Sequence, residues 1–266
     1  MIRARRAVVE ESGSHARTVR AAFGNTIVSL PKHPSLRSLC VEEGETLQPQ
    51  ASADQKIFKI RLADSRGHCE AASVFVKRRY AWRGYQVGGI NGTQPNRVTF
   101  SAADCEEIIA AISVGLDSMT GLFVDKLYGE EVDQLRTQNR RVCEFTKLAI
   151  EAGVRSKSIL AALFHIAYIH ARRINRCTDL VVEVNPRHAS FYKHMLGFAD
   201  CGSERLDPRV GATAVLLRLD LAFAEREIAE MGGRLELAST KRSLYPYFFA
   251  ANEEMAVERR LRTVAC

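Results

Sequence analysis

Apolar residues in 54–222 recur at two different spacings, which distinguish the predicted strands from the predicted helices. Alternation of apolar and polar residues is typical of a strand, and apolar residues three and four apart are typical of a helix with one buried face. The pattern predicts strands over 56–62, 109–116, 122–125, 140–150, 179–184 and 214–221, and helices over 67–82, 129–136, 157–175 and 187–196. The order strand, helix, strand, helix, strand over 140–221 predicts a parallel strand pair joined by a crossover helix, inside an α/β or α+β layer structure.

The hydrophobic periodicity changes after residue 53 and again after residue 222, which predicts three segments. Residues 1–53 mix prolines, serines and charges with little periodicity, which predicts an irregular N-terminal extension. Residues 54–222 carry the periodic pattern and form the predicted main domain. Residues 223–266 predict a C-terminal helical extension of one or two amphipathic helices, broken near Gly232 and Pro246.

The composition narrows the class of protein. The 266 residues are 46% hydrophobic and 26% charged, which is ordinary for a globular protein and excludes a disordered or collagen-like chain. The best apolar stretch, Ile159–Ala171, is shorter than the roughly 20 residues that a membrane-spanning helix needs, so no membrane span is expected. Seven scattered cysteines without a C-x-x-C pair predict a cytoplasmic protein with neither a disulfide framework nor a metal site.

The charge is unevenly distributed and suggests an anionic partner. The formal net charge is +7, and the run from Arg155 to Arg176 contains no acidic residue. A positive field of this kind attracts nucleic acid, acidic proteins or phosphates. The sequence has no helix-turn-helix and no aromatic platform, so a nucleic-acid partner is not expected.

One segment carries a family resemblance. Residues 185–198 read NPRHASFYKHMLGF between two predicted strands, with Tyr192 seven residues after Asn185. This segment resembles the last helix of the GCN5-related acyltransferases (GNAT fold). The resemblance implies an α/β (α+β) fold with a mixed central sheet and helices on both faces. It also implies that Tyr192 protonates the leaving thioester sulfur, whereas the alternative is an aromatic residue of the core.

Two further segments resemble a narrower branch of that fold. Residues 144–148 read EFTKL where acyl-homoserine-lactone synthases have E-L-S-R-F, so Lys147 stands at the arginine position. The segment VFVKRRYAW, from Val74 to Trp82, is similar to the end of their first helix. The stretch CTDLVVEVNPRHASFYKHMLGF is most similar to the long-chain N-acyl amino acid synthases, which use acyl carrier protein. The resemblance makes residues 54–222 the acyltransferase domain.

Acyl transfer to an amine needs a base, because α-amino groups are mostly protonated near pH 7. Glu144 and Glu183 lie on adjacent predicted core strands and are the leading candidates, although each could instead form a structural ion pair. A period of two places Glu144 and Leu148 on one strand face and Lys147 on the other. Candidate substrate-binding residues are Arg141, Lys147, Asn185, Trp82 and Phe75.

The donor side is predicted from the basic run. A helix N-terminus binds anions, which points to the start of the helix at 157. Candidate carrier-protein or phosphopantetheine-binding residues are Arg155, Ser156, Lys157, Arg172, Arg173 and Arg176. Acetyl-CoA-binding members of this fold carry paired glycines here, and residues 153–158 have one. This favours acyl carrier protein over acyl-CoA as the donor, with a solvated helix face as the alternative for the basic side chains.

These observations together predict an enzyme that transfers a medium- or long-chain acyl group from acyl carrier protein to the α-amine of an amino acid. No resident cofactor or metal is expected, since the acyl-phosphopantetheine is itself the donor. Three alternatives stay open. They are an acyl-homoserine-lactone synthase, an acyl-CoA-dependent N-acetyltransferase and a non-catalytic anion-binding module.

Overall fold

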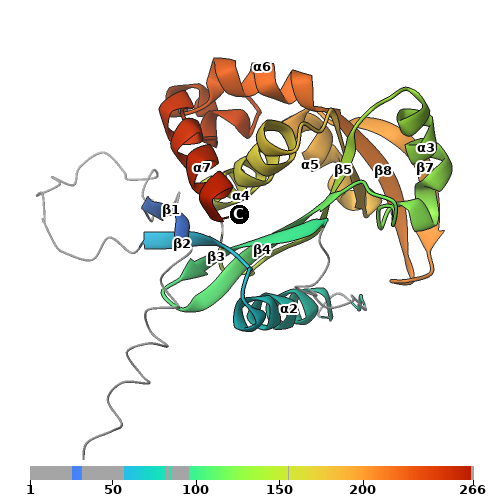
Figure 1. Cartoon of the computed structure of the whole chain (residues 1–266), viewed down its shortest axis with the longest axis horizontal. Coiled ribbons are helices and arrows are strands. Elements are labelled where there is room, and N and C mark those ends of the chain that lie inside the picture. Colours follow the sequence, from blue (N-terminus) through green and yellow to red (C-terminus); the bar gives the residue numbers. More distant parts are fainter. Residues whose placement is uncertain (1–25, 32–56, 82–83, 86–95, 155, 265–266) are drawn as a thin grey trace, which may run out of the picture.

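The computed structural model describes residues 26–31, 57–81, 84–85, 96–154 and 156–264. These residues form one mixed sheet with helices on both faces (Figure 1). Trp82 and Arg155, two of the predicted site residues, lie outside the described residues. So do residues 1–25 and 32–56, which make up most of the predicted N-terminal extension.

The sheet has eight strands in the order β1-β2-β3-β4-β5-β6-β8-β7. The strands are β1 (Thr26–Pro31), β2 (Ile57–Leu62), β3 (Arg97–Asp104), β4 (Glu107–Leu116), β5 (Val142–Ile150), β6 (Asp179–Val184), β7 (Ala199–Asp207) and β8 (Ala212–Asp220). Neighbouring strands run antiparallel except for β5 and β6, which are parallel. The predicted parallel pair with its crossover helix is thus confirmed.

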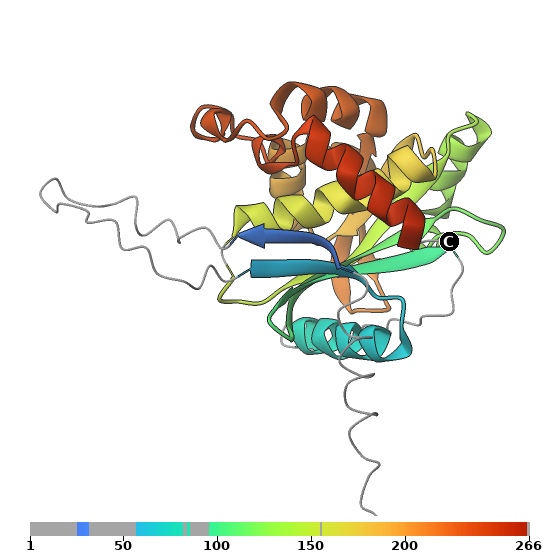
Figure 2. The same ribbon diagram turned by 60° about the vertical axis from the view of Figure 1, so that its left-hand side comes forward.

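Helices cover both faces of the sheet. They are α2 (Arg66–Ala81), α3 (Asp125–Thr137), α4 (Lys157–Tyr168), the π-helical turn η2 (Ile169–Ile174), α5 (Pro186–Leu196), α6 (Leu221–Met231), the short 3₁₀ turns η3 (Leu235–Ser239) and η4 (Tyr245–Tyr247), and α7 (Ala251–Val264). Figure 2 shows α2 on one face of the sheet and α4 with α7 on the other. The largest cluster of buried side chains lies under α4, and smaller clusters lie under α2 and α3.

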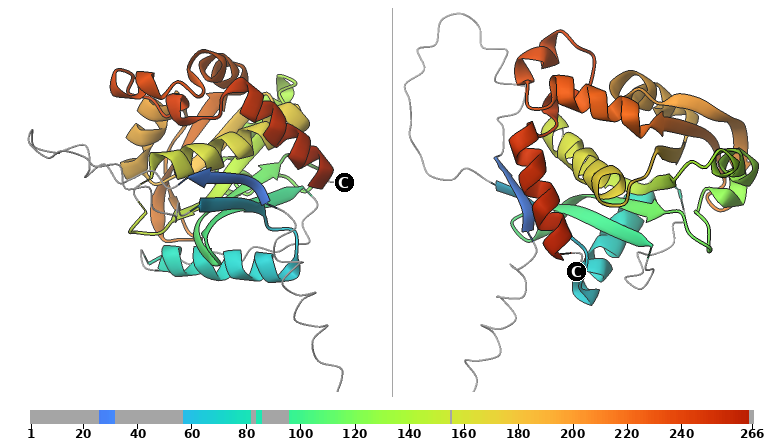
Figure 3. Two further views of the ribbon diagram at one scale, coloured as in Figure 1. Left: turned by 90° about the vertical axis from the view of Figure 1, so that its left-hand side faces the viewer. Right: turned by 45° about the horizontal axis from the view of Figure 1, so that its top comes forward.

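The described C-terminal residues pack onto the main core. His165 of α4 stacks between Phe248 at 4.8 Å and Phe249 at 5.0 Å, measured between ring centroids. Its Nδ1 accepts a hydrogen bond from the Phe249 N–H at 2.9 Å, so that nitrogen carries no proton. Figure 3 shows α7 lying across α4. The segment from 221 onward therefore stabilises the helix that follows β5.

The structure departs from the sequence prediction at four strands: one predicted strand is absent, and three observed strands were not predicted. Residues 122–124 form a turn before α3, which begins at Asp125, so the predicted strand at 122–125 is absent. Backbone N–H groups of the turn donate to carboxylates instead: Leu122 to Asp125 at 2.7 Å, and Phe123 to Glu144 at 2.9 Å. Strands β3 and β7 were not predicted, and β7 is mostly exposed, so it shows no apolar alternation. Residues 26–31, within the segment predicted as irregular, pair with β2.

Two absences concern the described residues. None of their helices is long and apolar enough to cross a membrane. No group of three or more His, Cys, Asp or Glu side chains among them is arranged to hold a metal ion.

Candidate active site

A cavity lies where β5 and β6 part. In the described residues the two strands pair from Val142–Asp179 to Glu144–Val181, and their ladder ends there. The space beyond holds a cavity of about 370 Å³. It is lined by Arg79, Tyr80, Tyr85, Phe145, Thr146, Lys147, Leu148, Ala149, Ile150, Glu183, Val184, Asn185, His188, Phe191, Tyr192, Asp207, Val210, Ala212, Thr213 and Ala214. Ligands in sheets of this kind bind at the carboxyl ends of parallel strands, which is where this cavity opens.

A β-bulge at Lys147 changes the face to which β5 side chains point. Lys147 has a φ of 54°, and the pairing of β5 with β4 shifts at this point. The ammonium of Lys147 consequently lies 5.7 Å from the Phe123 ring centre, beside the Glu144 carboxylate that binds the Phe123 N–H. Leu148 packs against the α4 core instead. The predicted faces of Lys147 and Leu148 were therefore wrong, because the extra residue of a bulge reverses the alternation.

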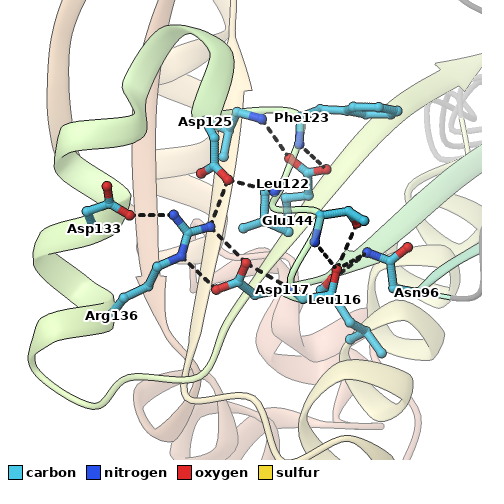
Figure 4. A network of polar contacts seen from close by, with 12 residues as sticks. Asn96, Leu116, Asp117, Leu122, Phe123, Asp125, Asp133, Arg136 and Glu144 are labelled. Carbon is cyan, nitrogen blue, oxygen red and sulfur yellow. Dashed lines mark hydrogen bonds and ion pairs between the residues drawn. The ribbon is translucent and has the colours of Figure 1, made fainter.

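The Glu144 carboxylate binds Arg97 and the backbone of the turn before α3. Its carboxylate is 1% exposed, forms an ion pair with Arg97, and accepts the N–H groups of Phe123 at 2.9 Å and Val124 at 3.0 Å. Figure 4 shows this carboxylate beneath the turn that leads into α3. Glu144 is not among the described residues that line the cavity.

Figure 4 also shows how the same turn is held from its other side. The Arg136 guanidinium donates to three carboxylates, those of Asp117 and Asp125 at 2.8 Å and that of Asp133 at 2.6 Å. Asn96 donates to the Leu116 carbonyl at 3.1 Å. The turn is thus fixed against both β5 and the end of β4.

Glu183 lines the cavity, and its pKa is raised above the ordinary value of a carboxyl group. Both of its oxygens accept from the Arg209 guanidinium at 2.6 Å. Burial raises the pKa of Glu183 to about 7, and the neighbouring Asp207 carboxyl acts in the same direction, while Arg209 opposes the shift. Both candidate acids thus form ion pairs, but only Glu183 is among the described residues that line the cavity.

Arg209 and Asp207 are functional candidates that sequence reasoning missed. Arg209 donates to Asp207 at 2.8 Å and to the Phe123 carbonyl at 3.1 Å, besides Glu183. These residues lie on the β7–β8 hairpin, more than 20 residues after Glu183 in the chain. Nothing in the local sequence signals that this hairpin lies beside β6 in the sheet, since β7 was itself not predicted.

Helix α5 forms the opposite wall. Asn185 caps it, accepting from the Arg187 N–H at 3.3 Å and donating to the Thr213 carbonyl at 3.1 Å, and Gly197 ends it with a φ of 79°. Tyr192 is buried against the ring of Phe164, whose centroid is 6.1 Å away. Burial keeps the pKa of Tyr192 above its ordinary value. Both Asn185 and Tyr192 line the cavity.

Two predicted substrate-binding residues lie elsewhere. Phe75 packs with Ala111 and Ala149 beneath α2 and is outside the set of described residues that line the cavity. Arg141, just before β5, donates to the Asn175 carbonyl at 2.9 Å, at the strand end remote from the cavity. From α2, Arg79 and Tyr80 line the cavity, and the Tyr80 hydroxyl donates to the Leu148 carbonyl at 3.1 Å.

The basic run does not form one continuous surface. At one end Ser156 caps α4 and Lys157 lies 5.6 Å from the centre of the Tyr247 ring. At the other end, roughly 25 Å along the helix, Arg172 and Arg173 pair with Glu225, and Arg173 also pairs with Glu254. Arg176 is exposed at that same far end. The arginines thus fasten α6 and α7 to η2.

Several solved structures are similar to this chain. The structure of FeeM, an N-acyl amino acid synthase from uncultured soil microbes, aligns with a TM-score of 0.56 and 24% identity over 62% of this chain and 92% of that chain. The acyl-homoserine-lactone synthase LasI aligns at 0.43 and 14% over 62% and 90%. An N-acetyltransferase from Staphylococcus aureus aligns at 0.44 and 14% over 62% and 98%.

The described sheet and helices share the fold of the FeeM structure, which confirms the predicted α/β fold class with a mixed central sheet. No curated protein matches the sequence significantly. The sequence model of the family described as N-acyl amino acid synthase FeeM matches residues 71–220, more than half of the chain. This protein therefore belongs to the FeeM family of N-acyl amino acid synthases, which are N-acyltransferases.

Proposed function

We propose that this protein transfers a medium- or long-chain fatty acyl group from the phosphopantetheine of an acyl carrier protein to the α-amino group of an amino acid. The observation that carries the proposal is the cleft between β5 and β6. Glu183, whose pKa is about 7, lines the cavity in this cleft. The part of β5 beyond Glu144, which is not paired with β6, lines the same cavity.

Glu183 is the proposed general base. Near neutral pH most of an α-amine is ammonium and cannot attack a thioester. A carboxyl group with a pKa of about 7 is half ionised at that pH, which suits it to taking the proton. Glu144 is assigned a positioning role instead, because Arg97 and two backbone N–H groups already occupy its oxygens.

The donor is proposed to lie along β5. Beyond Glu144 this strand faces the cavity instead of β6, so its peptide groups are placed to pair with the two amides of pantetheine as an added strand does. The amine nitrogen forms a bond to the thioester carbon as the carbon–sulfur bond breaks. Glu183 receives the amine proton and Tyr192 gives its proton to the departing sulfur. Because its pKa is raised, the Tyr192 phenol stays protonated until that step.

The carrier phosphate is assigned to the N-terminus of α4. Backbone N–H groups and the helix dipole there attract an anion, and Lys157 adds a positive charge. Arg172 and Arg173 are excluded from this role because they are ion-paired at the far end of the helix. Free thiols at the five described cysteines fit our placement of the reaction in the reducing cytoplasm.

The test is mass spectrometry of products from purified protein, a mixture of amino acids, and either acyl carrier protein or CoA charged with the same acyl chain. The proposal expects an N-acyl amino acid, formed faster from the carrier protein. A preference for acyl-CoA would overturn the donor assignment, and a homoserine lactone product would overturn the acceptor assignment. No acylated amine with either donor would refute the proposal as a whole.

A further inference from the structure

The cavity presents opposite charges from its two strands. Lys147 enters it from β5 and Glu183 from β6, both beyond the point at which the strands stop pairing. The bulge at Lys147 brings the ammonium to the face that holds Glu144 and Phe123. A strand without this bulge would point Lys147 toward α4, away from that face.

The surroundings of Lys147 favour an anionic ligand. The Glu144 carboxylate nearby is already held by Arg97 and two backbone N–H groups. Burial together with the positive charges of Arg97 and Lys77 lowers the pKa of Lys147 to about 8, and Glu144 opposes the shift. A carboxylate bound in the cavity would stabilise the protonated ammonium.

Two arginines near the cavity bind carboxylates of the protein. Arg79 binds Glu151 at 3.0 Å, and Arg209 binds both Glu183 and Asp207. Lys147 lies on β5 and Glu183 on β6, and both line the cavity. The two side chains can therefore bind two different groups of one small ligand. A free α-amino acid carries an amine and a carboxylate on the same carbon, which matches that arrangement.

We infer that Lys147 binds the α-carboxylate of the acceptor while Glu183 receives its α-amine, so that the enzyme selects free α-amino acids over amines without a carboxylate. This inference rests on the proposed function and adds which part of the acceptor is recognised. An amino acid amide keeps the amine and the side chain but leaves Lys147 without its carboxylate. A hydrogen bond to a charged group corresponds to a discrimination of about 10- to 100-fold.

The experiment measures kcat/KM for the preferred amino acid and for its primary amide, with one acyl thioester donor, in four proteins. Wild type is expected to prefer the acid by about 10- to 100-fold. In Lys147→Met the KM for the acid should rise until the preference for the acid over the amide approaches one. Lys147→Arg should retain the preference, because the positive charge stays.

Lys126→Met is the matched control. Its ammonium lies 6.0 Å from the centre of the same Phe123 ring, but it is not among the described residues that line the cavity, so the preference should be unchanged. The ratio of two substrates in one protein cancels any loss of folded enzyme. A Lys147→Met protein that still prefers the acid would overturn the inference, as would a wild type that accepts both equally. A wild type that acylates neither would refute the proposed function instead.

Discussion

Replacing Arg209 with methionine should move the pH dependence of the reaction to higher pH. Arg209 donates to both oxygens of Glu183, and its charge lowers a pKa that burial has raised to about 7. Without it, burial and the remaining Asp207 carboxylate both favour the protonated acid. The Glu183 pKa must therefore rise in the variant, and a smaller fraction of the base is ionised at neutral pH.

The size of the effect follows from the exposure of the pair. A nearby opposite charge shifts a carboxyl pKa by about 1–3 units, and the lower end applies because the Arg209 side chain is one-third exposed. A rise from about 7 to about 8 lowers the ionised fraction at pH 7 from about one half to about one tenth. The expected loss in kcat/KM at pH 7 is thus about five-fold, and most of it should be recovered near pH 9.

The assay is a profile of kcat/KM from about pH 5.5 to about pH 9.5 with saturating acyl donor. Arg205→Met is the matched control, because Arg205 belongs to β7, pairs with Glu131 at 2.5 Å and lies outside the described cavity lining. Its profile should superimpose on that of wild type. If kcat/KM of Arg209→Met rose with pH over the same range as in wild type, Glu183 would not be the group whose titration controls the rate.

The remaining predictions concern the base and the framework. Glu183→Gln should lower kcat by about 10²–10⁴ while leaving the melting temperature close to wild type; near-wild-type turnover would place the base elsewhere. Glu144→Gln should lower the free energy of unfolding by about 3–5 kcal/mol in urea titrations, since it leaves Arg97 buried without its counter-charge; unchanged stability would contradict this. Gly197→Ala should lower the melting temperature, because its φ is 79° and a Cβ would lie 2.3 Å from the Phe223 ring; an unchanged melting temperature would show that the helix end adapts.

The framework around the site is largely predictable from sequence. The strand at 179–184 and the helix that ends at Gly197 match β6 and α5, because a buried apolar run, a capping residue and a terminating glycine are all local signals. The helix predicted over 157–175 is present as α4 and η2 together. Its change to a π-helical turn has no such signal and coincides with the arginines that fasten the C-terminal helices.

The details that set the chemistry depend on contacts distant in sequence. The β-bulge at Lys147 inserts one residue into β5, and nothing in the local sequence marks a lysine with a positive φ. Arg209 reaches Glu183 because β8 pairs with β6, which brings the turn between β7 and β8 beside the end of β6. Of the predicted site, Lys147, Glu183, Asn185 and Tyr192 meet in the cavity, since they lie at the adjacent ends of β5, β6 and α5.

Sequence alone treats Glu144 and Glu183 as equivalent acids in apolar strands, and the structure makes them parts of one arrangement. The Phe123 N–H donates to Glu144, and the Phe123 carbonyl accepts from Arg209, which in turn holds Glu183. Displacing Glu144 would therefore disturb Arg209 through the turn at Phe123, and activity would fall although Glu144 touches no substrate. Loss of activity by itself cannot tell the two roles apart. A fall in stability identifies the residue that holds the turn, and a fall in turnover at constant stability identifies the residue that accepts the proton.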